Sequence, residues 1–216
     1  MPYRRTENVV RRLAERKEAI LAAATAIAAE GGMAAVHIVA VAARAGIAAG
    51  TVYRYFPSKT DLVSDLVAVV AGRELSAMTA AGDAAPGPLS ALAACIATFS
   101  ARALNERRLA WAVIGEPVDA QVDAIRVDFR RSLAAELEAR IKTAIAGRHL
   151  PGQDAGVAAP AIVGALMEGL LGPLAPTPAD AAAARAAVQS TTLLALRALG
   201  VVDARARGLV AQCVLP

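Results

Sequence analysis

Cysteine, histidine and aromatic residues are scarce in this chain of 216 residues, which has two cysteines, two histidines and 3% aromatic residues. Cys95 and Cys213 lie far apart and lack the short spacing of a metal-binding motif. We therefore interpret them as reduced structural thiols, with a redox switch as the alternative.

The sequence motifs of common enzyme classes are missing as well. The chain contains no GxGxxG, GxxxxGK, HExxH or GxSxG. His37 and His149 each lack an evident catalytic partner. A metal or acid/base site formed by His149 and Glu168 is conceivable, although a histidine after Gly147 is typical of an exposed helix end. We expect a protein that is not an enzyme and has no catalytic residue, metal or cofactor.

Apolar runs of membrane length are also missing. The apolar stretches are interrupted before the roughly 18 residues that a membrane helix needs, and the amino terminus lacks a hydrophobic signal core. The sequence predicts a cytoplasmic protein with no membrane partner.

What the chain does contain is alanine, within a hydrophobic content of 56%. Alanine favours helices, and the alternation of β-branched residues that is typical of strands is nearly absent. A length of 216 residues allows one or two domains with a core of their own. We therefore expect an all-α protein.

The segment HIVAVAARAGIAAGTVYRYFPSKTDL at residues 37–62 predicts two short helices around a glycine turn. Apolar residues recur at helical spacing over Ile38–Arg44, and Gly46 can adopt the left-handed conformation of a helix C-cap. A second helix is predicted over residues 49–56, because Pro57 cannot continue it.

A third helix is predicted to begin at Ser58. Asp61 follows three residues later and completes a capping box, with an acid near the positive end of the helix. The helix is expected to run to about residue 81, so three helices lie close together. This pattern is typical of a helix-turn-helix that reads DNA.

The middle helix carries more polar and aromatic groups than a helix buried on one side needs. Tyrosine hydroxyls and the Lys59 ammonium group suit phosphate oxygens, whereas Thr51 and Arg54 can reach base edges in a major groove. Tyr53 and Tyr55 supply the hydroxyls. The alternative is a polar helix face in solvent.

Charge supports contact with DNA, because residues 1–60 carry a net charge of +5 and residues 61–216 a net charge of −1. A polyanion attracts such a segment through counterion release. A basic arm is also predicted ahead of the first helix. It either contacts a minor groove or phosphates, or is disordered, and it consists of Arg4, Arg5, Arg11 and Arg12.

The stretch AARAGIAAGTVYRYFPSKTDL resembles the signature of the TetR family of one-component transcriptional regulators, and a preceding helix over residues 11–30 fits that family. The resemblance covers residues 11–66, and the remainder matches in length and helical layout only. It implies a helix-turn-helix DNA-binding domain at residues 1–60 and a helical effector-binding and dimerisation domain at residues 61–216.

The resemblance also implies roles for residues of the reading helix. Thr51 is expected near bases, while Gly50 allows close approach of the helix to DNA. Phosphates are expected to be held by Tyr53, Tyr55 and Lys59.

This chain departs from the family pattern at three positions. Ala48 stands where a serine often begins the reading helix, and Ala49 follows, so a hydroxyl cap and one polar contact are missing. Alanine can still touch a thymine methyl group. His37 stands where serine or threonine often caps the preceding helix and touches a phosphate, which leaves it as a cap, a phosphate donor or neither.

The carboxy-terminal part is predicted to be a bundle. The segment GDAAPGP at residues 82–88 breaks the chain, and an apolar repeat from Val122 to Ile145 predicts one long helix ending at Gly147. Two more helices are predicted at 154–171 and 177–199, the second capped by Thr177.

These last two helices carry many small residues, and we interpret them as the interface of a homodimer. The alternative is packing within one subunit. The small residues are Ala161, Gly164, Ala165, Ala184, Ala187, Thr191 and Ala195.

The resemblance implies a ligand cavity among the middle helices, which we expect to be apolar. Its candidate lining includes Phe99, Trp111, Phe129 and Met167, although each is also an ordinary core residue. Charged residues interrupt the apolar pattern at Glu116, Arg126 and Glu168. They either form ion pairs with one another or bind a polar group of an effector.

Together these features predict a sequence-specific transcriptional regulator. We expect a homodimeric repressor that a small, largely apolar effector releases from a palindromic operator in double-stranded DNA, with the helix that begins at Ser58 as the lever. The alternative is a helix-turn-helix protein whose carboxy-terminal domain only dimerises or binds a protein partner.

Overall fold

A computed structural model describes the backbone of residues 3–214 and the side chains of residues 8–214. Helices follow one another throughout this part of the chain, and it contains no strand, so the prediction of an all-α protein is confirmed. The α-helices are α1 (Tyr3–Gly31), α2 (Ile38–Arg44), α3 (Ala49–Tyr53), α4 (Lys59–Asp83), α5 (Pro88–Asn105), α6 (Arg107–Ile114), α7 (Ala120–Ala146), α8 (Ala155–Leu166), α9 (Ala181–Ala198) and α10 (Asp203–Gln212). A short 3-10 turn covers Met33–Ala35 and a π-helical turn covers Met167–Leu171.

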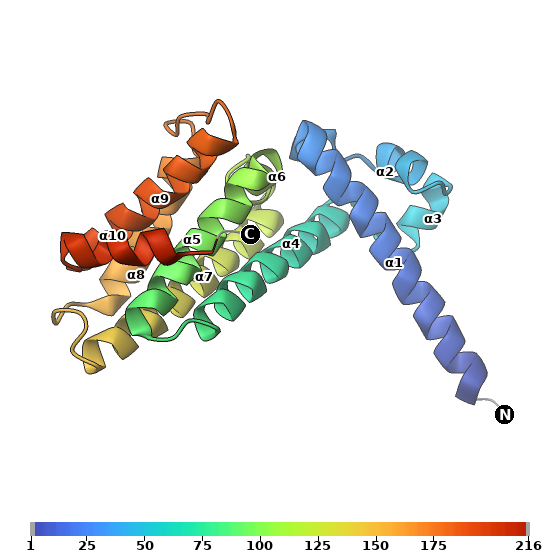
Figure 1. The fold of residues 1–216 in the computed structure, drawn as a ribbon. Coiled ribbons are helices and arrows are strands. Elements are labelled where there is room, and N and C mark those ends of the chain that lie inside the picture. The colour runs from blue at the N-terminus through green and yellow to red at the C-terminus, as the bar shows by residue number, and fades with distance from the viewer. Residues whose placement is uncertain (1–2, 215–216) are drawn as a thin grey trace.

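The helices form two groups that α4 connects (Figure 1). Helices α1 to α3 lie at one end and are called the head, and helices α5 to α10 form a bundle called the body. Helix α7 packs against α4, α5 and α8 in the body, and its apolar residues Phe129, Leu133, Leu137 and Ile141 are buried. The long helix predicted up to Gly147 is therefore present and central.

Side chains cap the start of several of these helices, and the cap of α4 is the predicted one. The Asp61 backbone N–H donates to Ser58 Oγ at 3.1 Å, and the Ser58 backbone N–H donates to the Asp61 carboxylate at 3.0 Å. This is the expected capping box, and it positions the start of α4 shortly after α3. Helix α7 begins in the same manner, because the Val122 N–H donates to Asp119 at 3.1 Å.

Two predicted helix ends are wrong. Helix α3 ends at Tyr53 rather than at Phe56. The N–H groups of Tyr55 and Phe56 both donate to the Val52 carbonyl, so the regular hydrogen-bond pattern of the helix stops before Pro57. Helix α9 begins at Ala181, since the cap is Asp180, whose carboxylate accepts from the Ala183 N–H at 2.8 Å.

Thr177 is not the cap of α9, because its hydroxyl has another partner. Arg107, at the start of α6, donates to Thr177 Oγ1 at 2.7 Å and to the Ala175 carbonyl at 3.2 Å. These bonds hold residues 175–177 in an extended connection over α6. The sequence analysis also missed α10, which packs across α9 and α5.

Among the described residues, none of the helices is both long and apolar enough to cross a membrane. In the same part of the chain, no three His, Cys, Asp or Glu side chains are grouped so that they could hold a metal ion.

Candidate nucleic-acid interface

The turn between α2 and α3 has the geometry that its glycine predicts. Gly46 has a φ of 65°, in the left-handed region that favours glycine. The next N–H, of Ile47, donates to the Ala42 carbonyl at 3.0 Å and closes the end of α2. The chain can therefore reverse within four residues and place α3 across α2.

Two buried side chains hold α3 against the rest of the head. Val52 is fully buried and Phe56 is 2% exposed, and both belong to the main core. On the outer side, Tyr53 is 53% exposed and Arg54 is also exposed. The helix thus presents its polar groups outward from a fixed base, which is what a reading element requires.

The remaining predicted contact residues differ in exposure, and Tyr55 packs partly against the core. Gly50 and Lys59 are exposed, and Thr51 and Tyr55 are half-buried. No described atom lies within 4 Å of the position that a Cβ atom would occupy at Gly50. Packing within the chain therefore does not require a glycine there.

The N-cap residues of α2 and α3 both lack a side-chain capping hydrogen bond. Ala48 is the N-cap of α3 and supplies only its carbonyl, which accepts from the Thr51 N–H at 2.8 Å, so the side-chain cap is missing as predicted. Ala49 follows it, half-buried. His37 is the N-cap of α2, but its side chain makes no capping hydrogen bond and is exposed, which excludes the cap interpretation.

Ion pairs fix the helices of the head relative to one another. Arg44 on α2 donates to both oxygens of Glu30 on α1, at 2.7 and 2.6 Å. Lys17 on α1 lies 2.6 Å from the Asp65 carboxylate and 5.6 Å from the centre of the Phe56 ring. These contacts join α1 to α2, to α4 and to the segment that follows α3.

The basic residues near the amino terminus do not precede the first helix as predicted. Arg11 and Arg12 lie within α1, because that helix already begins at Tyr3. The side chains of Arg4 and Arg5 lie outside the described residues.

The body contains an apolar pocket between α4, α5, α6 and α7, and two predicted ligand residues, Phe99 and Phe129, line it. Its volume is only about 20 Å³, roughly the space of one water molecule. The sequence analysis missed the charged residues that line the same pocket, namely Arg73, Glu74, Arg102 and Glu106.

These four charged residues form one network. Arg102 donates to Glu74 at 2.6 and 3.0 Å, and Arg73 donates to Glu74 and Glu106, each at 2.8 Å. Burial raises the pKa of Glu74, but the hydrogen bonds from Arg102 and Arg73 outweigh burial and hold the pKa below its usual value. The network contains two arginines and two glutamates, so it adds no net charge to the pocket.

Comparison with known proteins identifies the head. The family model described as "Bacterial regulatory proteins, tetR family" matches residues 20–66, which include α2, α3 and the start of α4. The chain carries the DNA-binding domain of the TetR family.

Curated relatives match the TetR-type domain and little more. The HTH-type transcriptional repressor KstR of Mycobacterium tuberculosis is 52% identical over 69 residues, which are 32% of this chain and 30% of the relative. KstR of Rhodococcus jostii is 48% identical over 73 residues, or 34% of this chain and 32% of the relative. The aligned part of the chain thus spans about a third of the length of these curated relatives.

Solved structures resemble the chain over most of its length. RolR without ligand has a TM-score of 0.66 at 19% identity, covering 92% of this chain and 98% of RolR. The regulator FadR from Bacillus subtilis, solved in complex with stearoyl-CoA, has a TM-score of 0.72 at 20% identity, covering 86% of this chain and 98% of FadR. At this identity the likeness shows that head and body together share one fold with these proteins.

A polar junction connects the TetR-type domain to the body, and two predicted ligand residues belong to it. Glu116, after α6, accepts from the Met33 N–H at 2.7 Å and pairs with Arg108, which also donates to the Gly31 carbonyl at 3.1 Å. Arg126 on α7 is 2% exposed and donates to the carbonyls of Glu116 and Ala112.

The three predicted charges, Glu116, Arg126 and Glu168, do not form ion pairs with one another. Glu116 does form an ion pair, with Arg108, but Arg126 binds backbone carbonyls instead of a carboxylate. Burial lowers the pKa of Arg126 below the usual arginine value. Glu168, the third charge, is exposed.

The remaining predicted ligand residues do not join Phe99 and Phe129. Trp111 is half-buried and packs over Gly115, where a Cβ atom would lie 2.3 Å from the indole ring. Met167 is half-buried at the start of the π-helical turn. Neither lines the pocket that holds the two phenylalanines.

Three of the seven predicted small residues are exposed, and all three lie on α8. Ala161, Gly164 and Ala165 are exposed on α8, and Leu194 on α9 is 59% exposed. An open apolar groove of about 190 Å³ lies between the two helices. Ala195, in contrast, is 6% exposed and packs within the subunit.

Proposed function

We propose that this chain is a sequence-specific, DNA-binding transcriptional regulator with a DNA-binding domain at residues 1–60 and a regulatory and dimerisation domain at residues 61–216. The observation that carries the proposal is the orientation of α3. Val52 and Phe56 anchor it inside the head, while Tyr53 and Arg54 face outward within a TetR-type domain.

On DNA, α3 lies in a major groove. Thr51 and Arg54 read base edges, and the methyl groups of Ala48 and Ala49 contact thymine methyl groups. Four side chains in or near α3 donate to phosphates, which sets the register of the helix on the duplex. They are Tyr53, Tyr55, Lys59 and His37. Gly50 allows the helix backbone to approach the duplex.

The regulator acts as a homodimer that pairs through α8 and α9. Exposed Ala161, Gly164 and Ala165 let two helices approach closely, and Leu194 supplies apolar area. A two-fold dimer presents two copies of α3, so the operator is a palindrome with half-sites about 34 Å apart or a multiple of that distance.

The body makes the regulator responsive to a small, largely apolar effector, and binding releases DNA. The support is a shared fold, since RolR has been solved with resorcinol and FadR with stearoyl-CoA. The effector enters between α4, α5, α6 and α7, beside Phe99 and Phe129. Helix α4 couples the sites, because it begins at Lys59 and reaches the pocket at Val70.

A second candidate is a regulator whose body only dimerises. The observation that favours it is the pocket volume of about 20 Å³, because a body filled by its own side chains has no room for an effector. In that case no small molecule changes operator affinity.

The test begins with selection of bound DNA from a random library. We expect one palindrome, and we expect Tyr53→Phe, which removes a hydroxyl and keeps the ring, to weaken binding without changing the sequence preference. Lys59→Gln should weaken binding to all sequences and reduce the salt dependence by about one phosphate contact per subunit. Lys142→Gln is the matched control, because Lys142 lies in the body and pairs with Glu138.

Three results decide between the proposals. Selection of no preferred sequence, or equal effects of Lys59→Gln and Lys142→Gln, contradicts the DNA-binding function. A monomer in sedimentation at micromolar concentration contradicts the dimer. Ligand screening by thermal shift, followed by operator titration, separates an effector-responsive body from one that only dimerises.

A further inference from the structure

The amino-terminal half of α1 extends away from the protein as a free helix (Figure 1). Every residue from Asn8 to Ala19 is exposed, and Ile20 is the first residue that packs into the core. At 1.5 Å per residue these twelve residues extend for about 18 Å. We call them the free helix.

The large apolar side chains of the free helix are at least half exposed. Val9, Val10 and Leu13 are 54%, 61% and 50% exposed. Helices shorter than about 12–15 residues are marginal in water without packing. Within the described residues, the contacts of Lys17 with Asp65 and the Phe56 ring hold the carboxyl end of this segment, whereas its apolar residues are left open to a partner.

The charges on the free helix are sorted by face. Arg12 and Arg16 are four residues apart and share one face. Neither forms an ion pair or hydrogen bond within residues 8–214. Arg11, one position around the helix, is already paired with Glu15 at 3.5 Å. Among the described residues, the guanidinium groups of Arg12 and Arg16 are therefore unpaired. They lie beside the face on which Arg11 pairs with Glu15.

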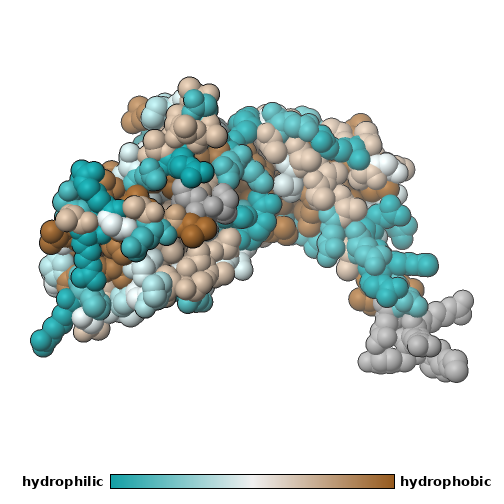
Figure 2. Space-filling view, viewed as in Figure 1, coloured by the Kyte–Doolittle hydropathy of each residue, from teal (hydrophilic) through white to brown (hydrophobic). Residues whose placement is uncertain are grey.

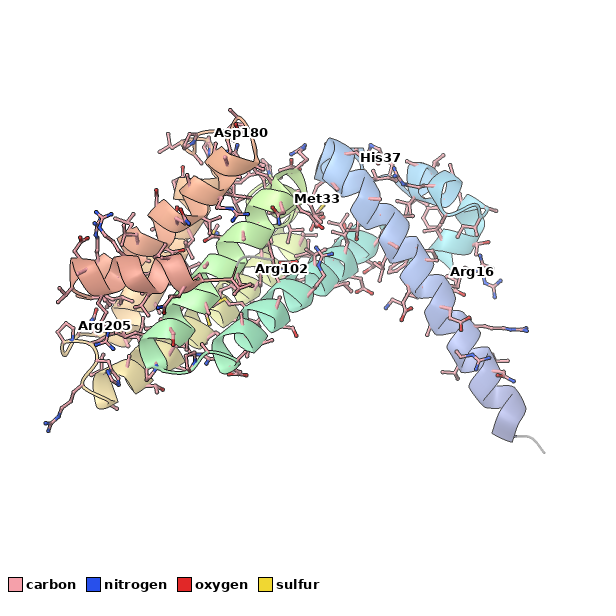
Figure 3. All side chains as sticks on the ribbon, in the orientation of Figure 1. Arg16, Met33, His37, Arg102, Asp180 and Arg205 are labelled. Atoms are coloured by element: carbon pink, nitrogen blue, oxygen red, sulfur yellow. The ribbon has the colours of Figure 1, made fainter. Side chains whose placement is uncertain are left out.

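The free helix also extends on the side of the molecule where α2 and α3 lie (Figure 1). Its end lies beyond the head on the side remote from α8 to α10, and α2 and α3 lie on that same side (Figure 1). Figure 3 shows Arg16 on the side of α1 toward α3. In the space-filling view, hydrophilic side chains continue along this part of α1 (Figure 2).

We propose that the free helix is a second DNA-binding element, in which Arg12 and Arg16 contact phosphates of the duplex that flanks the half-site read by α3. The chemistry is that of guanidinium groups on phosphate oxygens, which form bidentate, charge-assisted hydrogen bonds. The proposal rests on the proposed DNA-binding function and extends its footprint beyond the bases that α3 can reach.

The test variant carries Arg12→Gln and Arg16→Gln together and is called the double variant. The control variant carries Arg11→Gln. Glutamine matches arginine closely in helix propensity, so the free helix keeps its tendency to form. Each substitution removes the same charge from the same segment. The test variant removes two charges and the control removes one, so their effects are compared per charge removed. Arg11 differs from Arg12 and Arg16 in its face, because it belongs to the internally paired side.

The measurement is operator affinity against salt concentration for each protein. A dimer that loses four phosphate contacts should have a plot of log K against log salt that is shallower by about 3.6, and should bind roughly 30-fold more weakly per half-site at about 0.15 M salt. Arg11→Gln should change the slope by much less. Equal changes in slope per charge removed, for the double variant and for Arg11→Gln, would overturn the proposal.

DNA length provides an independent arm. A duplex trimmed to the two half-sites should cost the wild type affinity and leave the double variant unchanged, because the variant no longer uses the flanks. If trimming weakens both proteins equally, the free helix does not contact the flanking duplex. If the double substitution abolishes binding to anionic phospholipid vesicles and leaves operator binding intact, its partner is a membrane surface and the proposal is wrong.

Different results would contradict the proposed regulatory function and the proposed role of the free helix. Loss of all sequence preference in the wild type, with the salt slope still dependent on Arg12 and Arg16, contradicts sequence-specific regulation and supports the free helix as a DNA contact. Normal operator selection with slopes independent of these residues contradicts only the free helix.

Discussion

Replacing Gly50 by alanine should raise the stability of the free protein and lower its affinity for DNA. The Cβ atom would meet no described atom within 4 Å, and Gly50 lies inside α3 with no positive φ. Alanine is better than glycine in a helix by up to about 1 kcal/mol, and less is expected in the first turn. For a chain of this size, about 0.5 kcal/mol corresponds to a rise in Tm of about 1–2 °C.

On DNA the same methyl group occupies the space through which α3 approaches the duplex. Forcing a methyl group into a close contact typically costs about 1–3 kcal/mol, which corresponds to roughly a 5- to 150-fold loss of affinity per half-site. Thermal unfolding and operator titration of the same preparation check both signs. Gly46→Ala is the control, because its φ of 65° makes alanine strained and should lower Tm.

The result that refutes this reasoning is a Gly50→Ala protein that binds the selected operator as tightly as the wild type does. In that case α3 does not approach the duplex through Gly50. A fall in Tm would instead show that the position has a packing role in the free protein.

Three further predictions concern stability and the junction. Ser58→Ala breaks the capping box with Asp61 and should cost about 1 kcal/mol, seen as a Tm lowered by about 2–4 °C; an unchanged Tm contradicts the cap. Burial raises the pKa of the Cys95 thiol from 9.0 to about 11. The unfolded chain therefore loses this proton first, and the free energy of unfolding should fall as pH rises through that interval, less so in Cys95→Ala. Glu116→Ala removes the acceptor of the Met33 N–H, so hydrogen exchange at that amide should accelerate while the α4 amides stay protected.

Local signals made much of the fold predictable. The bounds of α2, the capping box of α4 and the end of α7 depend on residues adjacent in sequence, and they lie where the sequence places them. The errors occur where a distant residue decides. Thr177 is a good cap by type, but Arg107 takes its hydroxyl, and the cap moves to Asp180.

The candidate sites show the same division. The residues predicted to face DNA all lie within residues 37–59, so one motif identifies them together. The pocket residues come from separate helices, and sequence alone does not reveal that Phe99 and Phe129 line one pocket while Trp111 packs over Gly115. The network around Glu74 was missed because its arginines lie on two helices whose packing had to be known first.

The filled pocket of the body has a consequence for how an effector that enters there would be sensed. A pocket of about 20 Å³ is too small for such a ligand, so the ligand would bind only the fraction of molecules in which this pocket is larger. If that fraction is about one in a hundred, the apparent Kd is about a hundred times the intrinsic value. The packing around Phe99 and Phe129 would then set the concentration at which the regulator responds. Trimming either ring would lower that threshold and leave the DNA-reading surface unchanged.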